Sequence, residues 1–146
     1  MSAPDAKQLE NAHAFFKYLN VLDWESLGEL LSPECKHQYF PASVSPPDGK
    51  EMRGKQDFID IAKYNFEVLF EKFNFHAPLD VVHGSDKVVF HLKLDTSLKS
   101  GTKYNTEFII TLHFDGEKII KIREFVDSKG SSDFITALMS EAQPPA

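Results

Sequence analysis

The 146-residue sequence has one cysteine, fewer basic than acidic residues, and no long apolar run. With Cys35 alone, no disulfide can form within the chain, and chains of this size without a disulfide come more often from reducing compartments. No segment approaches the roughly 18 apolar residues of a membrane span, and the N-terminal residues lack the apolar core of a signal peptide. These absences predict a soluble, cytoplasmic protein that has no membrane partner.

Acidic residues outnumber basic ones, and most of the aromatic residues are Phe. Sixteen basic against 22 acidic residues give a formal net charge of −6, which is the wrong sign for a protein that binds nucleic acid. Phe supplies 13 of the aromatic residues, beside four Tyr and one Trp, and Phe rings suit a dry core or an apolar pocket because they need no hydrogen-bond partner. The length predicts a single domain over 1–146, with its core at about 9–138 and a flexible tail at 142–146.

Hydrophobic periodicity predicts helices first and then an antiparallel sheet. The predicted helices cover residues 6–22, 24–31, 55–72 and 133–141. The predicted strands cover residues 34–42, 51–53, 74–83, 87–98, 102–114 and 118–127. Short polar turns between the later strands favour hairpins. This order is the α+β pattern, and a curved sheet with three helices on one face can leave a pocket between the two layers.

Alternation along the predicted strands separates inward from outward side chains. In the strand over 87–98, His91 is expected to face solvent or a dimer partner, because the opposite face is apolar. That inward face consists of Val88, Phe90, Leu92 and Leu94.

Glu124 is the first candidate for a cavity acid or base. It shares its face of the strand over 118–127 with three apolar residues, Ile120, Ile122 and Val126. Such a position would bury a carboxylate and disfavour its charged form. The alternative is that Glu124 pairs with a neighbouring Arg or Lys at a strand edge.

Four segments carry a resemblance to a known group. They are YLNVLDWESLGELLSPE (18–34), MRGKQDFIDIAKYNF (52–66), VVHGSDKVVFHLKL (81–94) and FDGEKIIKIREFVDS (114–128). Over about 9–138 the chain resembles the SnoaL-like, polyketide cyclase-like branch of the nuclear transport factor two-like superfamily. This resemblance implies a cone-shaped α+β barrel, in which a curved, mostly antiparallel sheet wraps around the N-terminal helices and encloses an apolar cavity. It also implies a homodimer formed through the outer sheet face.

The resemblance leaves the reaction open, because the superfamily includes cyclases, ketosteroid isomerases, scytalone dehydratase, limonene epoxide hydrolase and non-catalytic modules. Limonene epoxide hydrolase would have an Arg and an Asp where this chain has Leu92 and Leu94, which argues against epoxide hydrolysis. That enzyme does have a carboxylate at the position that resembles Glu124.

Similarity to scytalone dehydratase suggests further site residues. Tyr39 and His76 resemble a cavity tyrosine and the catalytic histidine of that enzyme. Its helix-end aspartate would match Asn20, whose amide cannot act as a general base. Another of its cavity residues, an asparagine, would match Glu107, although alternation alone sends Glu107 outward.

These residues suit proton abstraction beside a carbonyl, with a hydroxyl donating to the developing oxyanion, and this chemistry needs no cofactor. Ketosteroid isomerase, in the same superfamily, works in this way. No metal is expected, because Cys35 and His37 are two potential ligands without a clear third. The predicted catalytic residues are His76, Glu124 and Tyr39. The predicted substrate-binding residues are His37, Asn20, Glu107, Phe16, Phe58 and Phe90.

The sequence therefore predicts a cofactor-independent isomerase or lyase, such as a dehydratase or cyclase, that acts on a hydrophobic small molecule. The alternative is a non-catalytic module that binds an apolar ligand or a protein. A homodimer is expected in both cases. Each candidate histidine also has an alternative reading as an ordinary structural residue.

Overall fold

The computed structural model describes residues 3–44 and 49–141. Its helices are α1 (Ala3–Val21), α2 (Trp24–Leu30), α3 (Lys55–Lys63), the π-helix η1 (Tyr64–Leu69) and α4 (Ser128–Glu141). Its strands are β1 (Leu31–Phe40), β2 (Arg53–Gly54), β3 (Phe70–Phe75), β4 (Asp80–Gly84), β5 (Lys87–Leu98), β6 (Lys103–Asp115) and β7 (Lys118–Val126). The α+β class is confirmed, and the predicted flexible tail at 142–146 lies outside the described residues.

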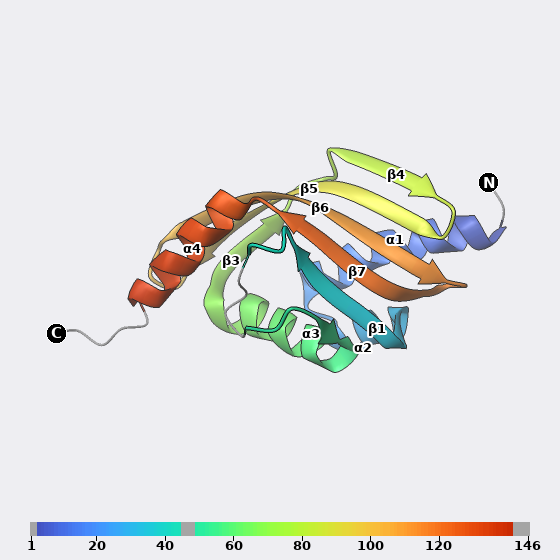
Figure 1. Cartoon of the computed structure of the whole chain (residues 1–146), viewed down its shortest axis with the longest axis horizontal. Coiled ribbons are helices and arrows are strands. Elements are labelled where there is room, and N and C mark those ends of the chain that lie inside the picture. The colour runs from blue at the N-terminus through green and yellow to red at the C-terminus, as the bar shows by residue number, and fades with distance from the viewer. Residues whose placement is uncertain (1–2, 45–48, 142–146) are drawn as a thin grey trace.

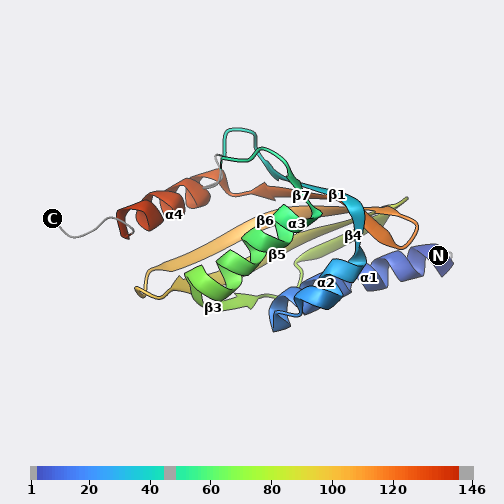
Figure 2. The ribbon, with the colours of Figure 1, turned by 90° about the horizontal axis from the view of Figure 1, so that it is seen from below.

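The strands form one seven-stranded sheet in the order β2–β1–β7–β6–β5–β3, with β4 also pairing to β5. Neighbouring strands run antiparallel except β1 and β7, which run parallel. The sheet is curved, and α1, α2 and α3 lie against one of its faces (Figure 1 and Figure 2). Within the described residues no helix covers the opposite face, and α4 extends beyond the end of β7. This opposite face is called the outer face below.

The core lies between the helices and the inner face of the sheet. The side chains of β5 alternate as the sequence predicted, with Val88, Phe90 and Leu92 buried. Aromatic rings from α1 meet these strands edge-on, and the ring centres of Phe16 and Phe90 are 4.9 Å apart. Edge-to-face contacts of this kind add to the stabilisation from buried apolar area.

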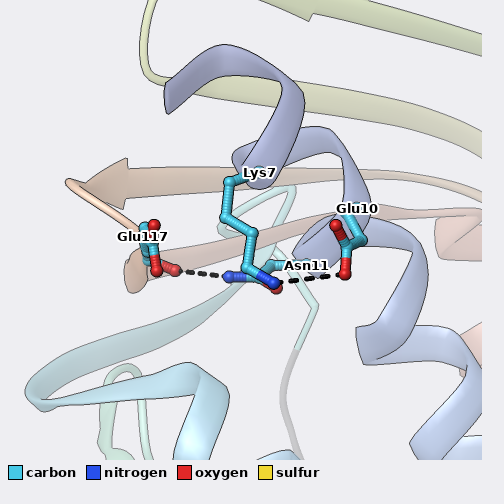
Figure 3. Close-up of polar contacts among 4 residues, drawn as sticks. All are labelled: Lys7, Glu10, Asn11 and Glu117. Carbon is cyan, nitrogen blue, oxygen red and sulfur yellow. Dashed lines mark hydrogen bonds and ion pairs between the residues drawn. The ribbon is translucent and has the colours of Figure 1, made fainter. Parts of the chain in front are cut away.

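Two polar side chains hold α1 against the hairpin turns at one end of the sheet. The buried Gln8 donates from Nε2 to Asp86 Oδ1 and to the Gly116 carbonyl, each at 2.8 Å. Asn11 Nδ2 donates to the Glu117 carbonyl at 2.9 Å (Figure 3). The nearby ion pair between Lys7 and Glu10 joins two residues of α1 and does not reach the sheet. The orientation of α1 is therefore tied to the β4–β5 and β6–β7 turns.

The predicted strand over 74–83 is divided into β3 and β4, which pair with the same edge of β5. Between the pairs Phe75↔Leu94 and Asp80↔His91, residues 76–79 stand opposite only two residues of β5. Pro78 lies in this break and has no N–H to donate to the ladder. The predicted helix over 55–72 also ends early, because β3 already begins at Phe70.

A register shift between β6 and β7 changes one predicted side chain. Phe114 pairs with Ile119 and His113 with Lys121, so Ile120 is the extra residue of a β-bulge. Ile119 is fully buried and Ile120 is 36% exposed, so the prediction that Ile120 faces inward is wrong.

Basic residues form a row across the outer face. Lys36, Lys121, His113 and Lys87 are successive register partners on β1, β7, β6 and β5. Partial burial lowers the pKa of His113, and the nearby charges of Lys87, Lys121 and Arg123 lower it further. Protonation of His113 is thus less favourable in the folded chain than in the unfolded chain.

This lowered pKa predicts a pH-dependent loss of stability. As the pH falls below about 6.5, the unfolded chain takes up the His113 proton before the folded chain does, so this residue reduces the free energy of unfolding until the pH passes its lowered pKa. His113→Gln should lose less stability than wild type between about pH 7.5 and about pH 5.5 in urea unfolding. Lys121→Gln, which removes one neighbouring charge, should reduce the loss in part. An equal loss in all three proteins would contradict the prediction.

The single cysteine belongs to the core. Cys35 is buried on the inner face of β1, and burial raises the pKa of its thiol to about 12. The thiolate is the nucleophilic and metal-binding form of cysteine, so the folded protein keeps this thiol in its inert form.

The thiol should therefore resist labelling in the folded protein. At about pH 8, a pKa of about 12 leaves on the order of 10⁻⁴ of the thiol ionised, so dithionitrobenzoate should react at least about 10³-fold more slowly than with the unfolded chain. Absorbance of the released thiolate, with and without guanidinium, measures both rates. Rapid stoichiometric labelling of the folded protein would contradict this picture.

Candidate functional site

A cavity of about 180 Å³, partly open to solvent, lies between the inner sheet face and the helices. Helices α1, α3, η1 and α4 all contribute to its wall, which is mainly aromatic and aliphatic. Among the described residues, the polar side chains of the wall are Tyr39, Arg53, Asn65, Tyr104, Thr106, Glu124 and Ser131. These few groups decide what the cavity can recognise or transform.

Glu124 is the carboxylate of the cavity. It lies on β7 between Tyr39 of β1 and Ile110 of β6, its register partners. Its Oε2 is 2.6 Å from His37 Nε2, and the two side chains are 18% and 0% exposed. A hydrogen bond to an ionised carboxylate is stronger than a neutral one, especially away from water. His37 therefore holds Oε2 in place, and Oε1 stays available to a ligand.

His37 lies behind Glu124, not in the cavity wall. Its ring meets that of Tyr39 edge-on at 4.6 Å and lies 4.7 Å from that of Phe58. Its Nδ1 is buried and has no hydrogen-bond partner among the described residues. A ring protonated at Nε2 donates to the Glu124 carboxylate and leaves only an acceptor atom unpaired. The packing and this hydrogen bond make His37 a positioning residue for the carboxylate.

Arg53 and Tyr39 add a positive charge and a hydroxyl beside Glu124. Arg53 is 1% exposed, and its Cζ is 5.2 Å from the centre of the Tyr39 ring, a cation–π distance. It pairs with His37 in the register of β2 and β1. This end of the cavity, called the Glu124 end, therefore combines a carboxylate with two groups that can stabilise a negatively charged oxygen.

The other polar side chains of β6 and α4 form a second group, called the Tyr104 end. Tyr104 Oη is 3.0 Å from Ser131 Oγ, and the Tyr104 ring stacks on Phe134 with centres 4.2 Å apart. Thr106 Oγ1 is buried and has no hydrogen-bond partner among the described residues. The two ends are separated by apolar wall residues that include Phe108 and Val126.

Four predicted site residues line the cavity. They are Tyr39, Glu124, Phe16 and Phe58. His37 reaches the site only through Glu124, so the predicted direct contact of His37 with substrate does not match its position.

His76 is not in the cavity. It lies at the end of β3 on the outer face, where its Nε2 is 2.7 Å from Asp95 Oδ2 and its side chain is 43% exposed. The expectation that it acts as a cavity acid or base is wrong. Phe73 and Phe75 occupy the inward positions of β3 and pack against the core, which leaves the outward positions to Asn74 and His76.

Three further predicted contacts are also wrong. Glu107 lies on the outer face of β6, where its Oε1 is 2.5 Å from His91 Nε2. Asn20 is exposed near the end of α1. Phe90 is fully buried in the core and does not belong to the cavity wall.

Sequence reasoning missed five polar wall residues, which are Arg53, Asn65, Tyr104, Thr106 and Ser131. Alternation along β6 does place Tyr104 and Thr106 inward with Phe108 and Ile110, so this signal was sufficient to find them. Arg53 has no such signal, because β2 contains only two residues and alternation needs a longer strand.

The described residues were also searched for metal-binding groups and for membrane-spanning helices. Among residues 3–44 and 49–141, no group of three His, Cys, Asp or Glu side chains is placed to hold a metal ion. In the same residues, no helix combines the length and apolar character that a membrane crossing requires.

Solved structures similar to this chain share its whole architecture. The pinacolase BvnE from Penicillium brevicompactum is 21% identical, with a TM-score of 0.79 over 94% of this chain and 98% of that one. PrhC from Penicillium brasilianum NBRC 6234 is 18% identical, with a TM-score of 0.79 over 95% and 92% of the two chains. TerC, co-crystallised with polyporic acid, is 14% identical, with a TM-score of 0.75 over 89% and 98%. At these identities the likeness establishes the fold and not a reaction.

Two sequence comparisons gave different results. Comparison with curated proteins finds no match. The SnoaL-like domain profile matches residues 12–122, which is more than half of the chain. The sequence match over residues 12–122 therefore establishes that this chain belongs to the SnoaL-like domain family.

Proposed function

We propose that the cavity catalyses proton transfer at a carbon next to a carbonyl group of an apolar small molecule, so that the protein is a cofactor-independent isomerase or lyase. The observation that carries this proposal is Glu124, a carboxylate in an apolar cavity that is held by the fully buried His37. The fold is shared with enzymes such as the pinacolase BvnE, which supports catalysis without identifying the reaction.

Glu124 is the proposed general base. Its Oε1 takes the proton from the carbon beside the carbonyl, while Oε2 remains hydrogen-bonded to His37. Because that hydrogen bond fixes the carboxylate, little reorganisation is needed when the proton moves. The apolar wall lowers the local dielectric constant and so strengthens the electrostatic interactions inside the cavity.

Tyr39 and Arg53 are the proposed stabilisers of the enolate. As the proton leaves, negative charge moves to the carbonyl oxygen, where the Tyr39 hydroxyl donates and the Arg53 guanidinium supplies positive charge. Where a carbon–carbon double bond is conjugated with the enolate, return of the proton from Glu124 to the far carbon of that conjugated system completes an isomerisation. Where a leaving group is bonded to the carbon next to the carbanion centre, it departs with the bonding electrons and takes the proton from Glu124, while the carbanion electron pair forms the new double bond. This second course completes an elimination, so one site serves both reaction types.

Hydrogen exchange tests this step without the natural substrate. The probe is 2-tetralone, an apolar fused-ring ketone, and its exchange of carbon-bound hydrogen for deuterium in D₂O is followed by proton NMR. The protein should accelerate the exchange, and Glu124→Gln should reduce the acceleration by about 10²–10⁴-fold, the usual contribution of a general base.

The outer face offers a matched control for this experiment. Glu107 also pairs with a histidine, His91, but outside the cavity, so Glu107→Gln should keep the wild-type exchange rate. His76→Ala should keep it as well. The proposed reaction is wrong if 2-tetralone exchanges no faster with the protein than without it, or if Glu124→Gln keeps the full rate.

The alternative function is a binding module for an apolar ligand. It is favoured by the fact that, among the described residues, Glu124 is the only carboxylate in the wall and no histidine lines it. Binding of 2-tetralone without accelerated exchange would support this alternative. A ligand that co-purifies unchanged from cells would support it too.

We also propose that two copies associate through the outer face. Phe125 and its register partner Ile109 are 57% and 43% exposed there. Within the described residues no helix covers this face. A two-fold axis near Ile109 would bury the apolar pair of each copy against that of the other, which favours a symmetric homodimer.

Light scattering after gel filtration tests the dimer. We expect twice the chain mass for wild type at micromolar concentration, and the chain mass for Phe125→Glu, because a charge there would lie in the apolar part of the interface. Met139→Glu changes a similarly exposed apolar residue on α4 and should leave the dimer intact. A wild-type monomer at all micromolar concentrations would contradict the proposal.

A further inference from the structure

We infer that Asn65 is a recognition residue of the cavity, and that its side-chain amide binds a hydroxyl group of the ligand on the side away from Glu124. The ligand is then an apolar molecule with a carbonyl group at one end and a hydroxyl group at the other. This inference deepens the proposed function, and it rests on that proposal only for the reaction at the Glu124 end.

Asn65 interrupts an otherwise apolar helix face. The residues of α3 and η1 that line the cavity follow the three- and four-residue spacing of one such face, and Asn65 is the polar one among them. They are Phe58, Ile61, Ala62, Asn65, Phe66 and Leu69. Residues between them, such as Lys63 and Glu67, are exposed to solvent. The side chain of Asn65 therefore lies on the cavity side of the helix.

The amide of Asn65 is accessible and is not used by the fold. The residue is partly exposed and forms part of the cavity wall. Within residues 3–44 and 49–141, no hydrogen bond joins its side chain to another group. Its backbone carbonyl accepts from the Phe70 N–H, which holds the backbone of η1 in place without using the side chain. Both the N–H groups and the oxygen of the amide are thus available to a ligand.

This amide discriminates between ligands by the hydrogen bonds that they can replace. A ligand that fills the cavity displaces water from Asn65, and an apolar surface there would leave the amide without partners. Burying an unpaired amide is unfavourable. A ligand with a hydrogen-bonding group at this place avoids that cost, which is how a polar side chain in an apolar site rejects an analogue that lacks the group.

A hydroxyl group fits the amide better than the other common polar groups. The amide donates from Nδ2 and accepts at Oδ1, and a hydroxyl group can accept the first and donate to the second. A carbonyl oxygen would leave Oδ1 unpaired. A carboxylate or an ammonium group would need an opposite charge to offset its desolvation, and the charged side chains of the described wall, Glu124 and Arg53, belong to the other end.

Asn65 and Glu124 lie toward opposite edges of the sheet. Helix α3 packs against β1, the neighbour of β7, whereas η1 packs against β3 at the other edge (Figure 2). The ring of Phe58 is 4.7 Å from that of His37 behind Glu124. Asn65 lies seven residues further along the helix, which is roughly 10 Å. A fused two-ring molecule with an oxygen at each end, together with its hydrogen bonds, bridges such a distance.

A matched pair of ketones tests the role of Asn65. They are 6-hydroxy-2-tetralone and 6-methyl-2-tetralone, which differ only in the group at the end opposite the carbonyl. Calorimetry should give wild type an affinity for the hydroxyl compound about 5–10-fold higher than for the methyl compound. Asn65→Leu, an apolar replacement of similar size, should remove this preference, because the hydroxyl group then meets no partner there.

Asn20 provides the matched control variant. It is exposed near the end of α1, so Asn20→Leu makes the same chemical change outside the cavity and should keep the wild-type preference. Circular dichroism and thermal unfolding show whether Asn65→Leu is folded. If it is not, Asn65→Ala replaces it, with the same expected loss of preference.

Three outcomes would overturn the inference. The first is that wild type binds the hydroxyl compound no more tightly than the methyl compound, and the second is that the folded protein binds neither. The third is that Asn65→Leu keeps the preference. If Glu124→Gln then removes it, the hydroxyl group binds at the Glu124 end instead.

Glu124→Gln also separates this inference from the proposed function. Because the two probes have the same carbonyl end, this variant should change both affinities by the same factor and keep the preference for the hydroxyl compound. If exchange of 2-tetralone proves independent of Glu124 while Asn65→Leu removes the preference, the recognition by Asn65 stands and the proposed reaction does not. If Glu124→Gln abolishes exchange but wild type shows no preference, the reaction stands and the recognition by Asn65 does not.

Discussion

The parallel pairing of β1 with β7 is the constraint on which the candidate site depends. It brings His37 and Glu124, which are 87 positions apart in the sequence, to 2.6 Å, and it places Tyr39 beside Glu124. A shift of one residue in this register would turn Glu124 to the outer face and leave a buried histidine without its partner. The short strand β2 extends the same arrangement, because its pairing with β1 positions Arg53 next to His37.

Histidine–carboxylate pairs occur both in the cavity region and on the outer face, and they differ in how far they are buried. Three His–carboxylate pairs occur among the described residues, with distances between 2.5 and 2.7 Å. Two of them, His76–Asp95 and His91–Glu107, are about 40–50% exposed on the outer face, where water and salt screen their interaction. The rings of Tyr39 and Phe58 contact His37 of the buried pair. The hydrogen bond between His37 and Glu124 is therefore screened less by water than those on the outer face.

The abundance of Phe explains how so few polar groups come to decide the function. Phe rings fill the core beneath α1 and also form most of the aromatic wall of the cavity, which the helices α3, η1 and α4 complete. Because the SnoaL-like fold supports different activities, the polar residues that interrupt this wall carry the specificity. Their division into a charged end and a hydroxyl end gives the cavity a direction, and that direction constrains which molecules can bind.

Local patterns in the sequence were enough to predict the α+β class and the bounds of β5. They were also enough to indicate the inward positions of Glu124, Tyr104 and Thr106, because alternation along a strand depends only on neighbouring residues. The tertiary structure alone decided the bulge at Ile120, the break at Pro78 and the outward position of His76, because these depend on pairing with a distant strand. It also decided the burial of Arg53 and the choice of His37 as the partner of Glu124. Those contacts join segments that are far apart in the chain, and no local pattern encodes which segments meet.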